Sequence, residues 1–252
     1  MPDLPATLTD LDLKSLSSKE KLQLLETLEE IDRRKSRRSI DSYFSTPEVR
    51  ASYPKQIQFF RLGAQFNERL LAGGNRSGKS LAGGYEMSLH LTGEYPDWWE
   101  GKKFYEPVMA WTAGDTAQSV RNIMQRLLLG PPGDIEAQGT GLIPGDLIVR
   151  TTPKHGIADA VESIFVRHVS GGTSTIQFKS FDQGREVFQG TSQHVIHLDE
   201  ECPMEIYTEC LLRTLTVHGI IYVTATPLLG LTDLMLAFMP EYVPEPEEVR
   251  VQ

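Results

Sequence analysis

The sequence has little cysteine, no excess of positive charge and no long apolar run free of charged residues. Two cysteines, Cys202 and Cys210, among 252 residues exclude a disulfide scaffold and favour a reducing compartment. The net charge of −9 argues against a protein that wraps nucleic acid over its whole surface, although a local basic face is compatible with it. One mostly apolar stretch, residues 220–239, contains Pro227 and Asp233, so we expect a buried strand, a loop and a helix rather than a membrane span.

We expect no secretory signal in the first ten residues, because they carry neither a basic region nor an apolar core. Residues 17–38 are predicted to form a helix, with a capping box of Ser17 and Glu20 and with leucines at helical spacing. The end of this helix is rich in arginine and lysine. It is either a solvated helix terminus or a patch that binds phosphate or a partner.

From residue 54 onward, apolar segments typical of strands alternate with segments of helical spacing. The predicted strands cover residues 69–72, 107–112, 195–198 and 220–223, and the predicted helices cover residues 81–91 and 116–129. Residues 163–169 and 173–178 flank a Ser-Gly-Gly turn and are predicted to form a hairpin. The alternation indicates an α/β fold with a mainly parallel central sheet flanked by helices.

The clearest chemical motif is a P-loop (Walker A), a glycine followed by four residues and then Gly-Lys-Ser. It lies between a predicted strand and a predicted helix, as the motif requires. Backbone N–H groups at such a turn cradle phosphates, and the helix N-terminus adds partial positive charge. Lys79 is expected to reach the β- and γ-phosphates of ATP, and Ser80 to bind Mg²⁺. The candidate nucleotide-binding residues are Gly73, Gly74, Asn75, Arg76, Ser77, Gly78, Lys79 and Ser80.

A second motif, typical of Walker B, lies at the end of the strand over residues 195–198. Asp199 follows that strand and is expected to hold Mg²⁺, and the next residue, Glu200, is placed to activate a water molecule. A glutamate in this position favours hydrolysis over phosphoryl transfer to a small acceptor. Glu201 is the alternative base. Thr224 and Thr226 end the next strand, where their hydroxyls either respond to hydrolysis or only cap a turn.

These motifs, together with several longer segments, resemble the large terminase subunit of tailed double-stranded DNA bacteriophages, of the short-tailed, headful-packaging type. The resemblance extends from about residue 11 to residue 239. It is carried by the P-loop, the Asp-Glu-Glu segment and five further segments at residues 90–96, 101–108, 183–185, 189–190 and 226–228. The Leu-Thr-Gly and Phe-Tyr-Glu-Pro parts of these segments are more specific than the P-loop.

The resemblance implies a P-loop NTPase fold of the ASCE type, and it implies how the chain is organised. Residues 1–45 would form an N-terminal helical segment, residues 46–240 the ATPase domain, and residues 241–252 a linker toward an absent C-terminal nuclease domain. Nuclease activity is therefore not expected of this chain. The implied function is ATP hydrolysis that moves double-stranded viral DNA into a procapsid.

The implied partners are the DNA, a portal protein, a small terminase subunit and further copies in a ring on the procapsid, without a membrane. We expect a monomer in isolation and a location in the host cell cytoplasm. The resemblance also assigns residues: Gln56 would pair with adenine, unless it is an ordinary surface amide. Arg76 would contact the γ-phosphate. Arg185 is the candidate arginine finger acting on a neighbouring subunit, with Arg121 and Arg126 as alternatives, and Thr224 to Thr226 match the coupling motif.

Other interpretations are weighed beside this one. A related P-loop helicase or translocase is the nearest alternative, a nucleotide-gated assembly module without turnover is another, and a small-molecule kinase is disfavoured by the Asp-Glu-Glu segment. His194, His197, Cys202 and Cys210 could suggest zinc, but their positions in a strand and a helix favour buried structural roles. Trp98 and Trp99 beside two lysines are expected to form a packed surface loop rather than a nucleic-acid platform.

Overall fold

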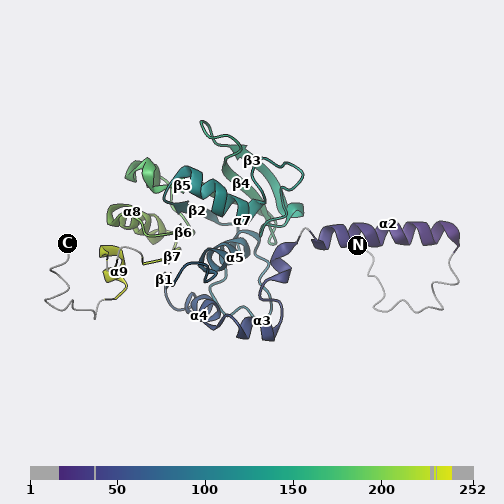
Figure 1. Cartoon of the computed structure of the whole chain (residues 1–252), viewed down its shortest axis with the longest axis horizontal. Helices are drawn as coiled ribbons and strands as arrows, with labels where there is room; N and C mark the ends of the chain where they lie inside the picture. The colour runs from purple at the N-terminus through teal and green to yellow at the C-terminus, as the bar shows by residue number, and fades with distance from the viewer. Residues whose placement is uncertain (1–16, 37, 228–229, 231, 240–252) are drawn as a thin grey trace. The chain divides into compact units, whose positions relative to one another are not determined.

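The computed structural model describes residues 17–36, 38–227, 230 and 232–239, and the chain divides into two compact units, residues 1–37 and 38–252 (Figure 1). The first unit contains helix α2 (Ser18–Ser36), which confirms the predicted helix. Its capping box forms as expected, because Ser17 N–H donates to Glu20 Oε2 at 2.8 Å and Glu20 N–H donates to Ser17 Oγ at 3.3 Å. The second unit begins at Arg38, whereas the sequence places the domain boundary after residue 45. The predicted linker, residues 241–252, lies outside the described residues.

The second unit is built on one seven-stranded sheet with the strand order β1-β7-β6-β2-β5-β4-β3. Its strands are β1 (Glu68–Ala72), β2 (Met109–Gly114), β3 (Ile148–Pro153), β4 (Val161–His168), β5 (Gly172–Ser180), β6 (Val195–Asp199) and β7 (Ile220–Ala225). Strands β1, β7, β6, β2 and β5 are parallel, and β5, β4 and β3 pair antiparallel, so the predicted sheet and hairpin are confirmed. Strand β7 stands between the P-loop strand β1 and the Walker B strand β6, which is the ASCE arrangement.

Helices connect the strands and cover the sheet. They are α3 (Pro47–Ala51), α4 (Pro54–Leu62), α5 (Lys79–Thr92), α6 (Ala117–Val120), α7 (Arg126–Leu129), α8 (Met204–Leu215) and α9 (Asp233–Ala237). Short turns of helix complete them: η1 (Ser39–Ser42), η2 (Arg121–Gln125), η3 (Gly145–Leu147), η4 (Phe181–Gln183) and η5 (Arg185–Phe188). Elements α6, η2 and α7 follow one another directly, so they form the helix predicted over residues 116–129. None of the helices in the described segments is both long and apolar enough to cross a membrane.

Two hydrophobic clusters lie on opposite faces of the sheet, because successive side chains of a strand point to opposite sides. In β7, Tyr222 joins the cluster that contains side chains of α4 and α5, while Ile221 and Val223 join the cluster that contains side chains of α8 and α9. Trp98 and Trp99 pack on the first of these clusters, Trp99 fully buried, which agrees with the expected packed loop. The parallel strands therefore carry buried residues on both faces and present their carboxyl ends at one edge.

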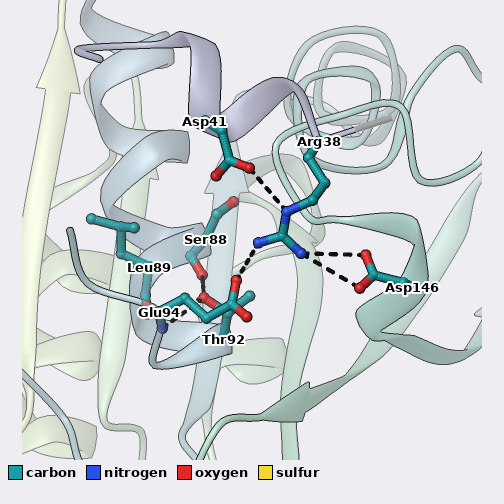
Figure 2. A network of polar contacts seen from close by, with 7 residues as sticks. All are labelled: Arg38, Asp41, Ser88, Leu89, Thr92, Glu94 and Asp146. Atoms are coloured by element: carbon teal, nitrogen blue, oxygen red, sulfur yellow. Dashed lines mark hydrogen bonds and ion pairs between the residues drawn. The ribbon is translucent and has the colours of Figure 1, made fainter. Parts of the chain in front are cut away.

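Arg38, the first residue of the second unit, forms ion pairs with three acidic side chains (Figure 2). It pairs with Asp41 of η1 at 2.9 Å, with Asp146 of η3 at 3.4 Å, and with Glu94, which follows the end of α5. Gly93, with a φ of +73°, ends α5. Arg38 thus ties η1 and η3 to the carboxyl end of the P-loop helix.

Candidate active site

The P-loop connects the end of β1 with the first turn of α5. Gly73 N–H donates to Ala225 O of β7 at 3.2 Å, so the loop begins on an anchored strand. Gly78 has a φ of +80°, a left-handed conformation that a side chain would strain, and α5 begins at the next residue. The loop residues from Gly74 to Ser77 are exposed. Their backbone is therefore accessible to an anion at the N-terminus of a 14-residue helix.

Two cationic side chains belong to this loop. Lys79 is 7% exposed, and its Nζ donates to Gly74 O at 2.9 Å, so the side chain folds back over the loop. This leaves two further N–H donors of the ammonium group for phosphate oxygens. Arg76 is exposed and has a φ of +61°, a conformation uncommon for a residue with a side chain. Lys79 is thus held at the loop, while Arg76 is exposed.

Asp199 ends β6 beside the P-loop helix. Ser80 Oγ donates to Asp199 Oδ1 at 2.8 Å, and Thr224 Oγ1 donates to the same oxygen at 2.7 Å. Burial raises the pKa of the Asp199 carboxyl, against these two hydrogen bonds and the positive charge of Lys79. A hydroxyl and a carboxylate side by side supply the oxygen ligands that Mg²⁺ prefers, so the side chains present fit this ion.

The two glutamates after Asp199 have different surroundings. Glu200 is half-buried, has a φ of +83°, and its Oε2 accepts from Thr226 N–H at 3.0 Å. Burial raises the pKa of Glu200, opposed by the Thr226 N–H and reinforced by the negative charge of Asp199. Glu201 instead accepts from Thr232 Oγ1 at the beginning of α9. Glu200 also lines a small cavity of about 40 Å³ together with Asp199, so it is the glutamate that faces the site.

Two further predicted residues contact the P-loop itself. Thr226 Oγ1 donates to Asn75 Oδ1 at 3.2 Å, which connects the end of β7 to the loop. Gln56 of α4 is buried, and its Nε2 donates to Ser77 O at 2.7 Å. In this structure the Gln56 amide therefore holds the loop backbone instead of standing free on the surface.

The candidate arginine fingers are engaged to different degrees. Arg185 is half-exposed and pairs with the buried carboxylate of Glu209 in α8 at 2.8 Å, a partner that Arg213 shares. Arg121 pairs with Asp159 at 3.2 Å. Arg126 is exposed and lines a cavity of about 350 Å³ that also reaches Ser80. Arg185 would have to leave Glu209 to act on a neighbouring subunit.

Sequence reasoning missed one residue of this site, Asp115, and it expected another, His197, to be buried. Asp115 follows β2 and lines the same small cavity as Glu200, and burial together with the charge of Asp199 raises the pKa of its carboxyl. The signal was a carboxylate directly after an apolar run. His197 is fully buried in β6, where burial lowers the pKa of its ring to about 3. His194, His197, Cys202 and Cys210 do not come together: within the described residues, no three His, Cys, Asp or Glu side chains form a metal-binding group.

Comparisons with known proteins identify a sequence relative and solved structures of similar fold. The large subunit of terminase from Salmonella phage P22 is 34% identical over 247 residues, covering 91% of this chain and 48% of that protein, so the chain spans about half the length of this relative. Among solved structures, a mutant ATPase domain of the large terminase of Thermus phage P74-26 is similar with a TM-score of 0.48 and 17% identity, over 71% of this chain and 69% of that one. A large terminase of a thermophilic bacteriophage in complex with ADP is similar with a TM-score of 0.42 and 14% identity, over 69% of this chain and 37% of that one.

A family model described as terminase large subunit, T4-like-virus type, N-terminal, matches residues 70–252. This range contains the P-loop, the Asp-Glu-Glu segment and the strand that separates them, and it is well over half of the chain. The chain therefore belongs to the family of terminase large subunits, as the N-terminal part of such a subunit.

Proposed function

We propose that this chain binds and hydrolyses ATP and is the ATPase domain of a viral DNA-packaging motor. The observation that carries the proposal is the position of Glu200. Its carboxylate lies next to Asp199 at the edge of the sheet where the P-loop also lies, and its pKa is raised by burial. A carboxylate of raised pKa beside a phosphate site suits a group that accepts a proton from water.

The P-loop supports the binding of the phosphates. Its exposed backbone N–H groups, the N-terminus of α5 and the ammonium group of Lys79 would receive the β- and γ-phosphate oxygens. Ser80 and Asp199 would hold Mg²⁺, which, when bound, neutralises charge on the β- and γ-phosphates. Ser80 Oγ donates to Asp199 Oδ1, so the two oxygens that would bind the ion lie 2.8 Å apart.

Hydrolysis then depends on where the attacking water is held. Glu200 would accept a hydrogen bond from this water and take its proton as the water oxygen attacks the γ-phosphorus and the bond to the β-phosphate oxygen breaks. The Thr226 N–H occupies Glu200 Oε2. Because Thr226 also contacts Asn75 of the P-loop, these contacts support a role of residues 224–226 in coupling hydrolysis to a movement of the loop.

We further propose the setting that the family relationship implies. The complete subunit would act on double-stranded viral DNA in the host cytoplasm, as a ring of copies on the procapsid, with a portal protein and a small terminase subunit. Arg185 would act across the ring, in the γ-phosphate site of a neighbouring copy, after release from Glu209. A planar guanidinium suits phosphate oxygens in such a role.

The hydrolytic role is tested with matched glutamate variants. Glu200→Gln keeps size and hydrogen-bonding capacity but removes the base, and steady-state phosphate release should fall by about 10² to 10⁴-fold. Binding of a fluorescent ATP analogue should persist. Glu201→Gln is the control and should retain most of the activity, because Glu201 is engaged with Thr232. A dead Glu201→Gln with an active Glu200→Gln would transfer the role to Glu201.

The same assays separate the alternatives. Nucleotide binding without phosphate release in the wild-type protein would favour an assembly module. Separation of a labelled duplex, driven by ATP, would favour a helicase. Release of phosphate without strand separation is the result that we expect.

A further inference from the structure

The side chain of His197 in β6 packs between the sheet and the P-loop helix α5. The side chain is completely buried, and its ring stacks on Tyr222 of β7 with centroids 4.9 Å apart and an angle of 25° between the planes. On the other side the ring lies against Gly83 of α5, where a Cβ atom would come within 2.4 Å of His197 Nε2. The Tyr222 hydroxyl donates to Gly83 O at 3.0 Å and holds the helix at this approach. The ring position is therefore set on both sides.

The hydrogen bonds around His197 determine which ring nitrogen carries the proton. His197 Nε2 lies 2.7 Å from Thr224 Oγ1, and Thr224 Oγ1 lies 2.7 Å from Asp199 Oδ1. Thr224 has a single hydroxyl proton, and a hydrogen bond to a carboxylate is stronger than one to a neutral imidazole nitrogen. Thr224 therefore donates to Asp199 and must accept from His197. The proton of the neutral ring is accordingly on Nε2.

The other ring nitrogen agrees with this assignment. His197 Nδ1 faces Thr112 Oγ1 of β2 at 3.4 Å, and a nitrogen without a proton can accept from that hydroxyl. No hydrogen bond joins His197 to Asp199 directly, since Nε2 lies 3.9 Å from Oδ1. His197 consequently reaches the carboxylate only through Thr224.

We propose that His197 is a positioning residue for Asp199, and this inference rests on the nucleotide-binding function proposed above. By donating to Thr224, His197 prevents the threonine hydroxyl from turning away, so that Thr224 keeps donating to Asp199. Both described hydrogen bonds to the carboxylate, from Ser80 and Thr224, fall on Oδ1. The carboxylate is thereby held with Oδ2 left for the hydration shell of Mg²⁺. Substitution of a residue that orients a metal-binding side chain typically weakens metal affinity by about 10- to 100-fold.

Two substitutions distinguish positioning from packing. His197→Gln retains an N–H donor at similar reach but loses the aromatic ring, whereas His197→Phe retains a ring that can stack on Tyr222 but has no donor. The readout is the Mg²⁺ concentration that gives half-maximal binding of a fluorescent ATP analogue at fixed nucleotide, with phosphate release measured in parallel. We expect His197→Phe to raise this concentration by about tenfold or more, while His197→Gln remains near the wild-type value. The opposite ranking, with Gln worse than Phe, would mean that the ring only fills space.

Thr224→Val completes the test, because it removes the relay without changing the histidine. If His197 acts through Thr224, the variant should require as much Mg²⁺ as His197→Phe, and the double variant should require no more. Additive losses, or a normal requirement in Thr224→Val, would overturn the inference, and this variant decides the question even if His197→Phe does not fold. If the wild-type protein binds the analogue but releases no phosphate, only the proposed hydrolysis is refuted. The binding measurements would still decide the role of His197.

Discussion

Removing one partner of the buried ion pair between the P-loop strand and the P-loop helix should strongly destabilise the fold. Glu86 of α5 and Arg69 of β1 form two contacts, at 2.6 and 3.1 Å, and both side chains are at most 3% exposed. Glu86→Gln removes the negative charge and leaves the guanidinium with the carbonyl of Phe59 at 2.8 Å and two aromatic faces. Breaking such a pair costs about 3 to 5 kcal/mol, because a buried charge is left uncompensated.

The magnitude is measurable by thermal or urea unfolding. For a domain of this size, each kcal/mol lowers Tm by about 2 to 4 °C, so Glu86→Gln should lower Tm by roughly 6 to 20 °C. Glu100→Gln is the matched control, since the Arg61–Glu100 pair is geometrically similar at 2.7 Å but more than half exposed. A surface pair of this kind contributes about 1 kcal/mol or less.

The combined variant Arg69→Met, Glu86→Leu gives the decisive comparison. It removes both charges and should recover much of the stability lost in Glu86→Gln, because replacing a buried pair with apolar side chains is often neutral. A Glu86→Gln variant as stable as Glu100→Gln would refute the reasoning. The reasoning would also be refuted if the free energy of unfolding of the combined variant were lower than that of Glu86→Gln by about a further 3 to 5 kcal/mol.

Three further outcomes follow from other contacts. Burial lowers the pKa of His90, opposed by Glu86, so the unfolded state takes up a proton first as the pH falls below 6.5, and this group then destabilises the fold by at most about 1.4 kcal/mol per pH unit. His90→Gln should therefore reduce the fall of the urea midpoint between pH 7 and 5, with the remaining fall due to His168, His194 and His197, whose pKa values are also lowered. Gly83→Ala places a methyl group 2.4 Å from the His197 ring and should cost about 1 to 3 kcal/mol by urea unfolding; an unchanged midpoint would contradict the close approach. If copies assemble in a ring as proposed, mixing subunits that lack Arg185 with subunits that lack Glu200 should restore part of the ATPase rate, and no recovery at any ratio would contradict action across the ring.

The features that could be predicted from the sequence are those encoded by short, local patterns. The P-loop requires glycines at fixed spacing, and the mostly apolar strand that ends in Asp199 is recognisable because parallel strands are buried on both faces. The resemblance to terminases is confirmed by the family relationship, and the mainly parallel sheet by the strand order.

The features that could not be predicted depend on pairing between distant segments. Strand β3 was missed because it lies at the end of the sheet, where its residues are at least partly exposed and do not alternate. The engagement of Arg185 depends on Glu209, which lies on a separate helix. The relation of His197 to Asp199 depends on the register of β6 and β7, which pairs Asp199 with Thr224, and no pattern within one strand contains that information.

The Arg38 contacts have a mechanical consequence. Any tension applied to the chain ahead of residue 38 enters the second unit at this arginine, and three carboxylates share it (Figure 2). One of them, Glu94, directly follows α5, whose opposite end carries Lys79 and Ser80. Helix α5 therefore joins the Arg38 contacts at its carboxyl end to Lys79 and Ser80 at its N-terminus, so a displacement of residue 38 relative to the sheet would reach the phosphate loop along a single helix.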